Sequence, residues 1–504
     1  MTHSNVTANG PATPRNEGVR EKLTAAVLAP IRAFRLSYLP LLMVYFAYGA
    51  LGLIAVGESF WVKKALTLNP AQLAQLGVWL TLPWAIKMVF GELVDTVAIL
   101  GSRRRVYVFI GAGMIATALI MLAGAAGGWV TFARPDRIYI LASLLLVTGT
   151  VLQDVVADAM STEVVPRTNP DGSPRPQADI DHDLGMVQVL GRLALSAGVF
   201  LTAGLAGWLA QHTSYENVFL IGLVVPVISA SGAALVHLDS SESRPTDWRI
   251  LSAGLAFGAV VTSLLAADVA YSQEIVFAIS LAVIVAMLHY VTRDISQETR
   301  RHIFYAALII FAFRATPGVG EGYRWFTIDK LGFDEAFFGV LGQTGAAIGL
   351  VATWLLSDSI TSKPITKVLL FLTILGGLMS LPDIVLVFGG HHWTEQHLGF
   401  GARTIALIDT AAQSPLGQLS MIPLLTLIAI YAPPAKRALW FALMASFMNL
   451  ALVAGQLQTK YLNQIYVVDR GAYDWLPTLV VTAVSVSVAV PLAAILLFGN
   501  RVRH

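Results

Sequence analysis

Residues 55–61 read AVGESFW and residues 318–324 read GVGEGYR, so the triplet Val-Gly-Glu returns after 263 positions. The same offset carries Asp95 onto Asp358. A second match, at an offset of 257, relates Leu193-Ala194-Leu195 and Ala197-Gly198 to Leu450-Ala451-Leu452 and Ala454-Gly455. Apolar matches arise easily by chance, so the charged pairs carry most of the weight. We interpret the pattern as an internal repeat whose two copies fold alike.

The composition places this repeat in a membrane. Hydrophobic residues make up 56% of the 504 positions, charged residues make up 13%, and the mean hydropathy is +0.68. These values lie far outside the range of soluble chains. The net charge of +2 indicates no nucleic-acid partner, and a chain without cysteine has no disulfide, thiolate metal site or cysteine nucleophile.

Fourteen apolar runs are long enough to cross about 30 Å of hydrocarbon as helices. Continuous runs separated by Pro, Gly and charged turns are typical of helices, whereas membrane barrels show short alternating segments. We therefore expect an all-α membrane protein. The expected spans are 38–59, 73–97, 105–131, 137–165, 184–210, 216–238, 249–270, 273–292, 302–322, 336–357, 366–388, 402–431, 437–460 and 477–498.

The repeat and the spans together predict two six-helix bundles with an inserted helix pair. Spans one to six correspond to spans nine to fourteen, which leaves spans seven and eight between the copies. Repeats of this kind place a substrate site between the halves, near the bilayer midplane. The expected division is a disordered cytoplasmic tail over 1–36, a first bundle over 37–238, a linker with the extra helices over 239–300 and a second bundle over 301–500.

Lys and Arg set the orientation, because they accumulate on the cytoplasmic side of a membrane. With the N-terminus inside, most loop cations lie in the cytoplasm, among them Arg103 to Arg105, Arg293, Arg300 and Arg301. Fewer fall in outer loops, including Lys63, Lys64, Lys460 and Arg470. Both termini are therefore expected to be cytoplasmic.

Three cations remain deep within spans, namely Lys87, Arg192 and Arg314. An intramembrane charge costs at least ~2.5–3.5 kcal/mol, so it should pair with an acid or face a wet cavity. At a rise of about 1.5 Å per residue, Lys87 reaches the depth of Asp154, and Arg192 reaches that of Asp158. We expect these four residues to form a polar cluster on a cavity wall. The alternative is that they are ion pairs that only lock the helices together.

Arg314 precedes Ala315-Thr316-Pro317-Gly318, where proline removes a helix hydrogen bond and glycine lets the backbone bend. This predicts a broken helix beside an arginine that can hold a carboxylate or phosphate. A simple proline kink with a structurally paired arginine is the alternative. Towards the outer side, the acids Glu58, Glu321, Asp383 and Asp409 are candidates for proton transfer or gating, or are ordinary acids at helix ends. No cofactor or metal site is expected.

The segment Gly91-x-x-x-Asp95 before Gly101-x-Arg103-Arg104-Arg105 resembles the loop motif of the major facilitator superfamily. In that motif the acid and the following cations latch the two halves on the cytoplasmic side. The resemblance implies a gating role for Asp95, and the repeat extends the gating role to Asp358. The acid and the second glycine stand further apart here than in the motif.

Four separated blocks resemble the folate-biopterin transporter family of that superfamily. They are Lys87-x-x-x-Gly91-x-x-x-Asp95-Thr96 with Gly101 to Arg105, Gln153 to Ala159 with Glu163, Arg314 to Pro317 with Leu331-Gly332-Phe333, and Gln418 to Met421 with Pro423, Pro433-Pro434 and Asn449. The family usually has proline after the lysine, where this chain has Met88. Many members have paired acids where Asp409 stands beside Thr410.

The resemblance implies a transporter and not an enzyme, with proton-coupled uptake of folates or pterins through a bacterial inner membrane by a monomer. Lys87, Asp154, Asp158, Arg192 and Arg314 would contact the substrate. The helix-four block and Leu190-Gly191-Arg192 also resemble bacterial muropeptide permeases, which is a second reading. A third is a membrane chaperone or receptor that transports nothing.

Overall fold

The computed structural model describes residues 34–169, 171–235, 248–267, 269–293, 295–361, 365–419, 424, 428 and 437–502. The expected tail over 1–36 therefore lies almost wholly outside the described residues. The described chain is helical throughout, apart from three isolated β-bridges in turns.

The described residues of the first half form nine α-helices. They are α2 (Leu39–Ala50), α3 (Ala55–Ala65), α4 (Pro70–Ala85), α5 (Lys87–Thr96), α6 (Arg105–Gly127), α7 (Pro135–Glu163), α8 (Gln177–His212), α9 (Tyr215–Gly222) and α10 (Val224–Leu235). The 3₁₀ turn Leu51–Ile54 joins α2 to α3, so both belong to one membrane-crossing segment, Leu36–Ala65.

Two helices follow in the middle of the chain, α11 (Trp248–Ala266) and α12 (Ser272–Thr292). The described helices of the second half are α13 (Gln297–Arg314), α14 (Glu321–Asp329), α15 (Glu335–Thr361), α16 (Ile365–Met379), α17 (Leu381–Val387), α18 (Gly390–Leu398), α19 (Ala402–Leu419), α21 (Arg437–Ile465) and α22 (Leu476–Phe498).

Within the described residues, ten segments are long and apolar enough to cross a membrane. The other four expected spans fall on α11, on α13 with α14, on α15 and on α19. Apolar stretches of α11 and α15 are shorter than a full span. The chain is therefore a multi-pass helical membrane protein, and the count of fourteen stays a prediction.

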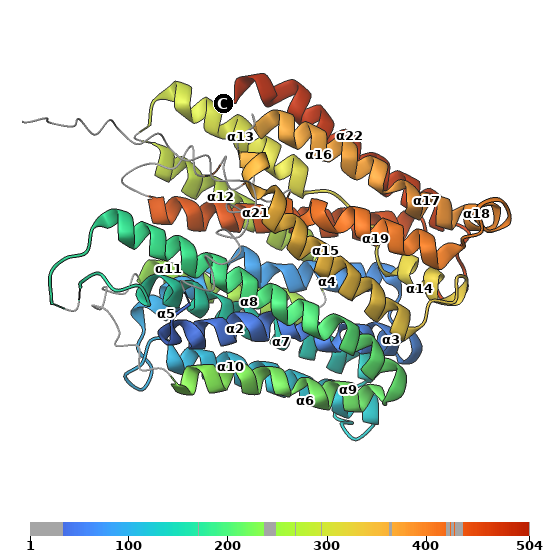
Figure 1. The fold of residues 1–504 in the computed structure, drawn as a ribbon, viewed down its shortest axis with the longest axis horizontal. Helices are drawn as coiled ribbons and strands as arrows, with labels where there is room; N and C mark the ends of the chain where they lie inside the picture. Colours follow the sequence, from blue (N-terminus) through green and yellow to red (C-terminus); the bar gives the residue numbers. More distant parts are fainter. Residues whose placement is uncertain are drawn as a thin grey trace, which may run out of the picture.

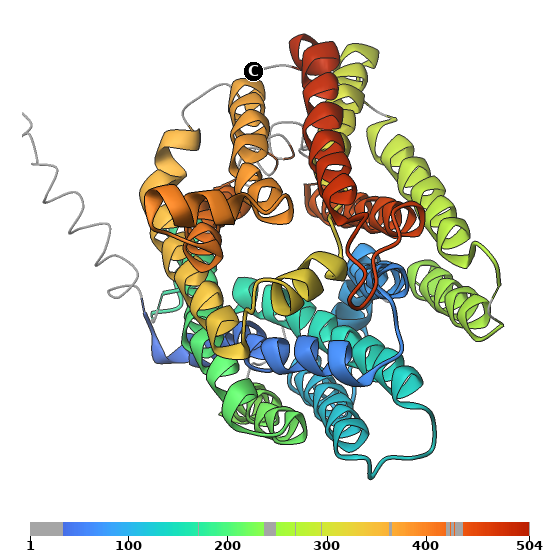
Figure 2. The ribbon, with the colours of Figure 1, turned by 90° about the vertical axis from the view of Figure 1, so that its right-hand side faces the viewer.

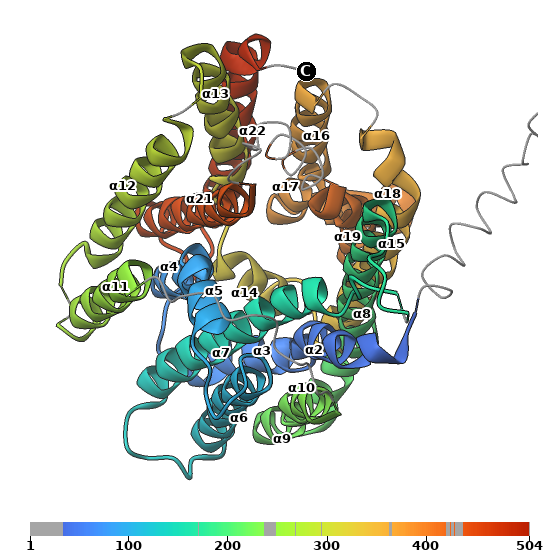
Figure 3. The same cartoon turned by 90° about the vertical axis from the view of Figure 1, so that its left-hand side faces the viewer.

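The helices gather into two groups that follow the order of the sequence. Figure 1 shows α2 to α10 on one side and α13 to α22 on the other, closer together towards α3 and α14 than at the opposite end. Figures 2 and 3 look along the long direction of the molecule and place α11 and α12 at its outside edge.

Helix α8 of the first group packs against α15 of the second group. At one point their backbones are in direct contact, with no side chain between them. A Cβ atom on Gly207 would lie 2.5 Å from the carbonyl oxygen of Glu335 and 2.7 Å from the Cα of Gly339. Only glycine permits an approach this close. The groups are therefore joined at a glycine contact, and α4 against α21 forms the second long contact between them.

Within each group, a matching glycine holds an inner helix against the first helix. A Cβ on Gly198 of α8 would meet the backbone of α2, 2.9 Å from the nitrogen of Ala50. A Cβ on Gly455 of α21 would lie 2.6 Å from the carbonyl oxygen of Thr316, beside α13. These two glycines are partners in the repeat found in the sequence, so they occupy equivalent packing positions.

The inserted helix α12 is anchored to α21 by a buried ionic contact. Lys460 Nζ lies 2.6 Å from Glu274 Oε1 and 2.9 Å from Gln273 Oε1. Lys460 was assigned to an outer loop from the sequence, but it lies within α21 and is only 6% exposed. The assignment was wrong because the helix continues five residues beyond the predicted apolar run, to Ile465.

Candidate functional site

Lys87 stands at a break in a membrane-crossing helix. Pro83 lies inside α4 and has no N–H to donate to the turn before it, and the backbone leaves helical geometry at Ile86. The helix restarts as α5 with Lys87 as its first residue. The proline therefore places the lysine at the kink, where its side chain turns towards α7.

Lys87 bridges two carboxylates of α7. Its Nζ lies 2.5 Å from Asp154 Oδ2 and 2.6 Å from Asp158 Oδ2. The two acids are four residues apart, so both stand on one helix face. The hydroxyl of Tyr45 on α2 donates to Asp158 Oδ1 at 2.8 Å. Three of the four residues of the predicted cluster are brought together as expected.

Arg192, the fourth predicted member, lies apart from the salt bridges. Arg192 is an exposed residue of α8. No carboxylate in the described part of the chain is within salt-bridge distance of its guanidinium. It is near enough to Asp154 and Tyr45 for electrostatic interaction. Asp158 pairs with Lys87 and not, as expected, with Arg192. The expectation was wrong because it was based on depth alone and did not include the kink at Ile86, which lets Lys87 reach both acids.

The cluster is open on one side. The side chain of Asp154 is 11% exposed, that of Lys87 is 25% exposed and that of Asp158 is 49% exposed. A half-exposed carboxylate in a membrane-crossing helix faces either lipid or water, and facing lipid is costly. This exposure favours a wet passage beside α7.

Aromatic side chains border the cluster. The rings of Tyr48 and Trp84 are stacked, with centroids 5.8 Å apart and planes inclined by 23°. The carbonyl oxygen of Trp84 accepts from Asn449 Nδ2 of α21 at 3.0 Å, so the second half of the chain reaches this level. Tyr45 and Tyr48 were not identified from the sequence, although hydroxyl-bearing side chains on an otherwise apolar helix were a usable signal.

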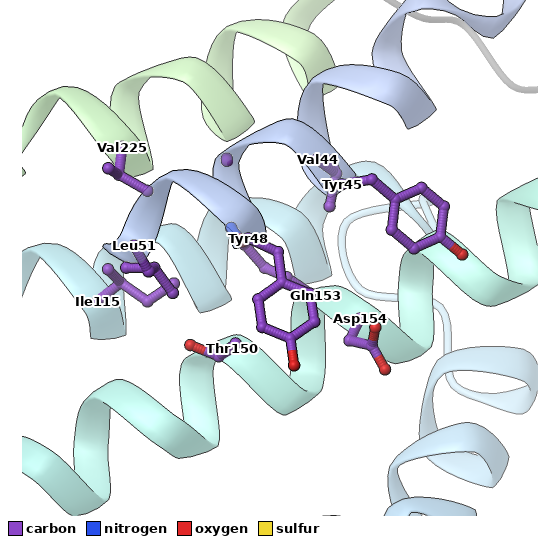
Figure 4. Close-up of a pocket in the computed structure, with 10 residues that line it drawn as sticks. Val44, Tyr45, Tyr48, Leu51, Ile115, Thr150, Gln153, Asp154 and Val225 are labelled. Carbon is purple, nitrogen blue, oxygen red and sulfur yellow. The ribbon is translucent and has the colours of Figure 1, made fainter. Parts of the chain in front are cut away.

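A small cavity lies beneath the cluster. It measures about 10 Å³ and is lined by residues of α2, α6, α7 and α10. Figure 4 shows the oxygen-bearing ends of Tyr48, Thr150 and Asp154 on the same side of it. This volume is about that of one water molecule. The cavity can hydrate the polar groups but is too small for an organic substrate.

The helix break predicted after Arg314 is present. Helix α13 ends at Arg314, and α14 begins at Glu321. The freed backbone groups have side-chain partners from α21 and α22. Gln458 donates to the carbonyl of Ala315 at 2.6 Å, the N–H of Gly318 donates to Thr459 at 2.9 Å, Asn463 donates to the carbonyl of Val319 at 3.1 Å, and Ser487 donates to that of Pro317 at 3.1 Å. Irregular backbone at this depth is tolerated because it is satisfied within the protein.

The repeated glutamates lie near one another. Glu58 of α3 has the hydroxyl of Tyr139 as a hydrogen-bond partner, and it interacts electrostatically with Glu321 and Arg324 of α14. The glutamates that the repeat relates are therefore close enough to interact electrostatically across the boundary between the two halves.

A second pair of acids lies within the second half. Asp409 Oδ1 accepts from Gln413 Nε2 at 2.6 Å, and Asp383 Oδ1 accepts from the hydroxyl of Tyr323 at 2.6 Å. The two carboxylates are close enough to interact electrostatically. Two neighbouring carboxylates repel each other when both are ionised, which favours protonation of one of them.

Asp95 is bound within the first half. Arg104 is 8% exposed and donates to Asp95 at 2.8 Å, to the carbonyl of Val94 at 2.8 Å, and to both carboxylate oxygens of Glu163 at 2.6 and 3.0 Å. These contacts join α5, its following loop and α7, and they do not latch one half to the other. Asp358 lies in α15, outside the residues whose side chains are described.

An ionic network that sequence reasoning missed joins the halves at the end of α3. Lys63 Nζ lies 2.5 Å from Asp329 Oδ1, and the hydroxyl of Tyr473 donates to Asp329 Oδ2 at 2.5 Å. Lys64 Nζ lies 3.1 Å from Glu335 Oε1. These residues fell in predicted loops or helix ends, and their pairing depends on the tertiary fold.

Arg470 reinforces this end of the molecule. Its guanidinium donates to four carbonyl oxygens between Val62 and Leu68, at distances of 2.7 to 3.2 Å, and lies 4.2 Å from the ring centre of Trp325. We refer to Lys63, Lys64, Asp329, Glu335, Arg470 and Tyr473 as the end clasp. Burial raises the pKa of Asp329, but hydrogen bonds from Lys63 and Tyr473 lower it by more, so that the pKa lies below its usual value.

Among the described residues, no three His, Asp or Glu side chains gather closely enough to hold a metal ion. The arrangement instead offers an open acid–lysine cluster, a satisfied helix break and a clasp at one end.

The chain is similar to known proteins over nearly its whole length. Residues 49–504 match the model of the BT1 family. The chain is 26% identical to the folate-biopterin transporter of Synechocystis sp., over 97% of this chain and 86% of that protein. It is 22% identical to the probable folate-biopterin transporter 4 of Arabidopsis thaliana, over 88% of this chain and 91% of that protein.

Solved structures of transporters share the fold. A peptide transporter POT in complex with alafosfalin aligns with a TM-score of 0.64 and 17% identity, over 96% of this chain and 99% of that one. The nucleoside transporter NupG aligns with a TM-score of 0.61 and 13% identity, over 92% of this chain and 100% of that one. At these identities the likeness concerns the fold alone.

Proposed function

We propose, since the chain belongs to the BT1 family, that it carries folates or pterins across a membrane by proton-coupled alternating access. The relatives are transporters, so the chain is a membrane transport protein and not an enzyme. The observation that carries the proposal further is the cluster of Lys87, Asp154 and the half-exposed Asp158 inside a membrane-crossing helix group.

The architecture proposed for this function is that of the major facilitator superfamily. Two six-helix repeats, over 37–238 and 301–500, rock against each other, and the linker over 239–300 adds a helix pair. The equivalent packing of Gly198 and Gly455 supports this division, as do the two long contacts between the halves. Alternating access then requires that the halves pivot about those contacts.

The substrate site combines groups of both charges. A pterin ring presents a pair of N–H donors that a carboxylate such as Asp158 can accept, and the glutamyl carboxylates of a folate suit Arg192 and Arg314. Lys87 holds the two acids of α7 in place through its salt bridges in the absence of substrate. The stacked rings of Tyr48 and Trp84 offer a flat surface beside these groups.

Proton coupling is assigned to the buried acids on the outer side. Glu58 and Glu321 meet between the halves, so protonation of either one relieves repulsion across the boundary that must open. Asp409 with Asp383 forms a second acid pair that can hold a proton. Asp95 supports the inner end through Arg104, and the same role is proposed for Asp358 from the repeat.

The clasped end is assigned to the outer side of a bacterial inner membrane. This follows from the distribution of Lys and Arg, which places both termini in the cytoplasm. The structure then corresponds to a transporter closed outside. A monomer suffices for this mechanism, because both halves of the passage come from one chain.

Reconstituted vesicles test the proposal. Labelled folate, labelled pterin and an anhydro-muropeptide are offered to purified protein in liposomes, with and without a proton gradient. We expect gradient-dependent accumulation of folate or pterin. Accumulation of the muropeptide alone would favour a muropeptide permease, and binding without accumulation of any compound would favour a receptor.

A further inference from the structure

A groove on the outside of the second half separates the inserted helix α12 from α13. It has a volume of about 730 Å³, and its floor includes Phe447 of α21. Val285 on one wall is 53% exposed and Phe304 on the other is 59% exposed, so apolar side chains are left uncovered by the protein. A space of this size and lining matches sites for small organic ligands.

The two walls carry matching apolar stripes. Leu281, Val285 and Leu288 follow one face of α12, and Phe304, Leu308 and Phe311 follow one face of α13, with spacings of three and four residues in both cases. Both stripes start near the connection between the two helices and run into the membrane. The groove therefore has one polar end and one apolar end.

Cations gather at the polar end. Arg300, Arg301 and His289 line the groove there, and Arg501 lies over the ring of Tyr305 at 5.1 Å. No carboxylate of the described residues is within salt-bridge distance of Arg300 or Arg301. The neighbouring Glu298 is 88% exposed and lies nearest to His302, at 3.9 Å. The guanidinium of Arg300 donates to the backbone carbonyls of Arg293 and Ile295, so within the described residues the charge at this end has no carboxylate counter-ion.

Dimensions indicate which anion fits. From Arg300 to Phe311 the helix rises about 16 Å at 1.5 Å per residue, and one leaflet contributes about 15 Å of hydrocarbon. Basic pockets between membrane helices recognise anionic lipid headgroups. We propose that this groove binds one anionic glycerophospholipid, with its phosphate at Arg300 and Arg301 and its acyl chains along the two stripes.

The occupant is a lipid and not the transported solute, because the groove opens on the periphery of the helix group, where the surrounding bilayer lies, and not between the two halves. Bound there, the lipid fills the space between the inserted pair and the second half and fixes the position of α12 together with the Lys460–Glu274 contact. This inference stands independently of which solute is carried.

Native mass spectrometry of the purified full chain in mild detergent tests the site. Phosphatidylglycerol and phosphatidylcholine are titrated against the protein, and we expect preferential retention of phosphatidylglycerol. Arg300→Gln and Arg301→Gln should each weaken its binding roughly fivefold, which is the effect of one cation at a charged lipid surface. Binding of phosphatidylcholine should stay unchanged. Arg167→Gln, an exposed cation in another loop, serves as the matched control.

A second variant tests the apolar part without altering charge. Val285→Trp fills the groove and should reduce lipid retention while Arg300 and Arg301 remain. Equal retention of both lipids, or unchanged retention in the arginine variants, would overturn the proposal. Displacement of the lipid by water-soluble glycerophosphoglycerol at equal concentration would do the same, because it would identify a site for the free anion.

Discussion

Lys87 is the residue on which the candidate site depends most directly. One ammonium group faces two carboxylates at 2.5 and 2.6 Å, so a single cation is shared by two acids. Asp154 is largely buried and Asp158 is half exposed, so the two acids have different access to a solute. We assign Asp158 to substrate contact and Asp154 to holding the lysine.

Lys87→Met should separate these roles. The change leaves Asp154 as a buried charge without its partner, which costs about 3–5 kcal/mol of stability. Substrate uptake should fall roughly 10- to 100-fold, as expected for loss of charge-assisted hydrogen bonds worth about 1.5–3 kcal/mol. Thermal unfolding in detergent and vesicle uptake measure the two effects.

A double variant and a control sharpen the result. Adding Asp154→Asn to Lys87→Met removes the stranded charge, so it should recover most of the stability but none of the uptake. Lys367→Met replaces an exposed lysine at the start of α16 and should change neither. Recovery of uptake in the double variant would show that the pair only locks helices together.

Arg314→Glu tests the other predicted cation. We expect the variant to reach the membrane and to unfold at a similar temperature, because the break after it is held by α21 and α22 side chains. Uptake of folate should be abolished, since a carboxylate there repels the carboxylates of the substrate. Normal transport by Arg314→Glu would make the arginine a packing residue.

At the scale of elements, the glycine contact between α8 and α15 is the point about which the halves would move in the proposed transport cycle. A Cβ on Gly207 meets backbone atoms of Glu335 and Gly339, which cannot rotate away. Gly207→Val should therefore separate the two helices, at a cost of about 1–3 kcal/mol for overpacking. Uptake should fall by at least roughly tenfold, by the same energy scale.

Gly204→Ala is the matched control on the same helix. The Cβ there would meet the side chain of Gln343, which is flexible and can shift. We expect little loss of stability or uptake. A similar loss in both variants would mean that α8 tolerates no added side chain anywhere, and the special role of Gly207 would be refuted.

The sequence predicted elements better than contacts. Apolar runs located the membrane-crossing helices, and Pro317 with Gly318 located the break between α13 and α14. Intramembrane charges predicted the contact of Lys87 with Asp154, because burial restricts the partners that a charge can have. The pairing of Lys63 with Asp329 was not predictable, since surface cations have many possible partners and only the tertiary fold selects one. The contact between Lys87 and Asp158 was not predictable either, because it depends on a helix kink that an estimate of depth from a constant rise per residue does not include.

At the scale of the whole molecule, the end clasp ties the halves together at one end of the membrane-crossing segments. Its ionic contacts connect α3 of the first half with the end of α14 and the start of α15 in the second half. The opposite ends of the helix groups lie further apart (Figure 1). An arrangement closed at one end is expected to reopen there when its ionic contacts are lost, and Asp329 is the group whose titration can do this.

Acidification of the clasped side should open it. The pKa of Asp329 in the clasp is below its usual value of 3.8, so the closed form binds its proton less well than an open form does. The contribution of Asp329 to closure is complete well above pH 3.8, and it is lost as the pH falls through the lowered pKa. The chain has no cysteine, so Thr131→Cys and Gln396→Cys can carry spin labels without background. We expect the label distances to be constant between about pH 7 and pH 5 and to lengthen in a growing fraction of molecules as the pH falls below 3.8 and through the lowered pKa of Asp329.

Asp329→Asn decides whether this carboxylate is responsible. The amide cannot titrate and binds Lys63 less strongly than the carboxylate, so the longer distance should be populated at every pH and its fraction should not respond to acid. Asp171→Asn alters an exposed carboxylate in a loop between α7 and α8, away from the clasp, and should leave the titration as it is. If Asp329→Asn lengthens with acid as the parent does, another group, such as Glu335 opposite Lys64, drives the opening and Asp329 is only a structural contact.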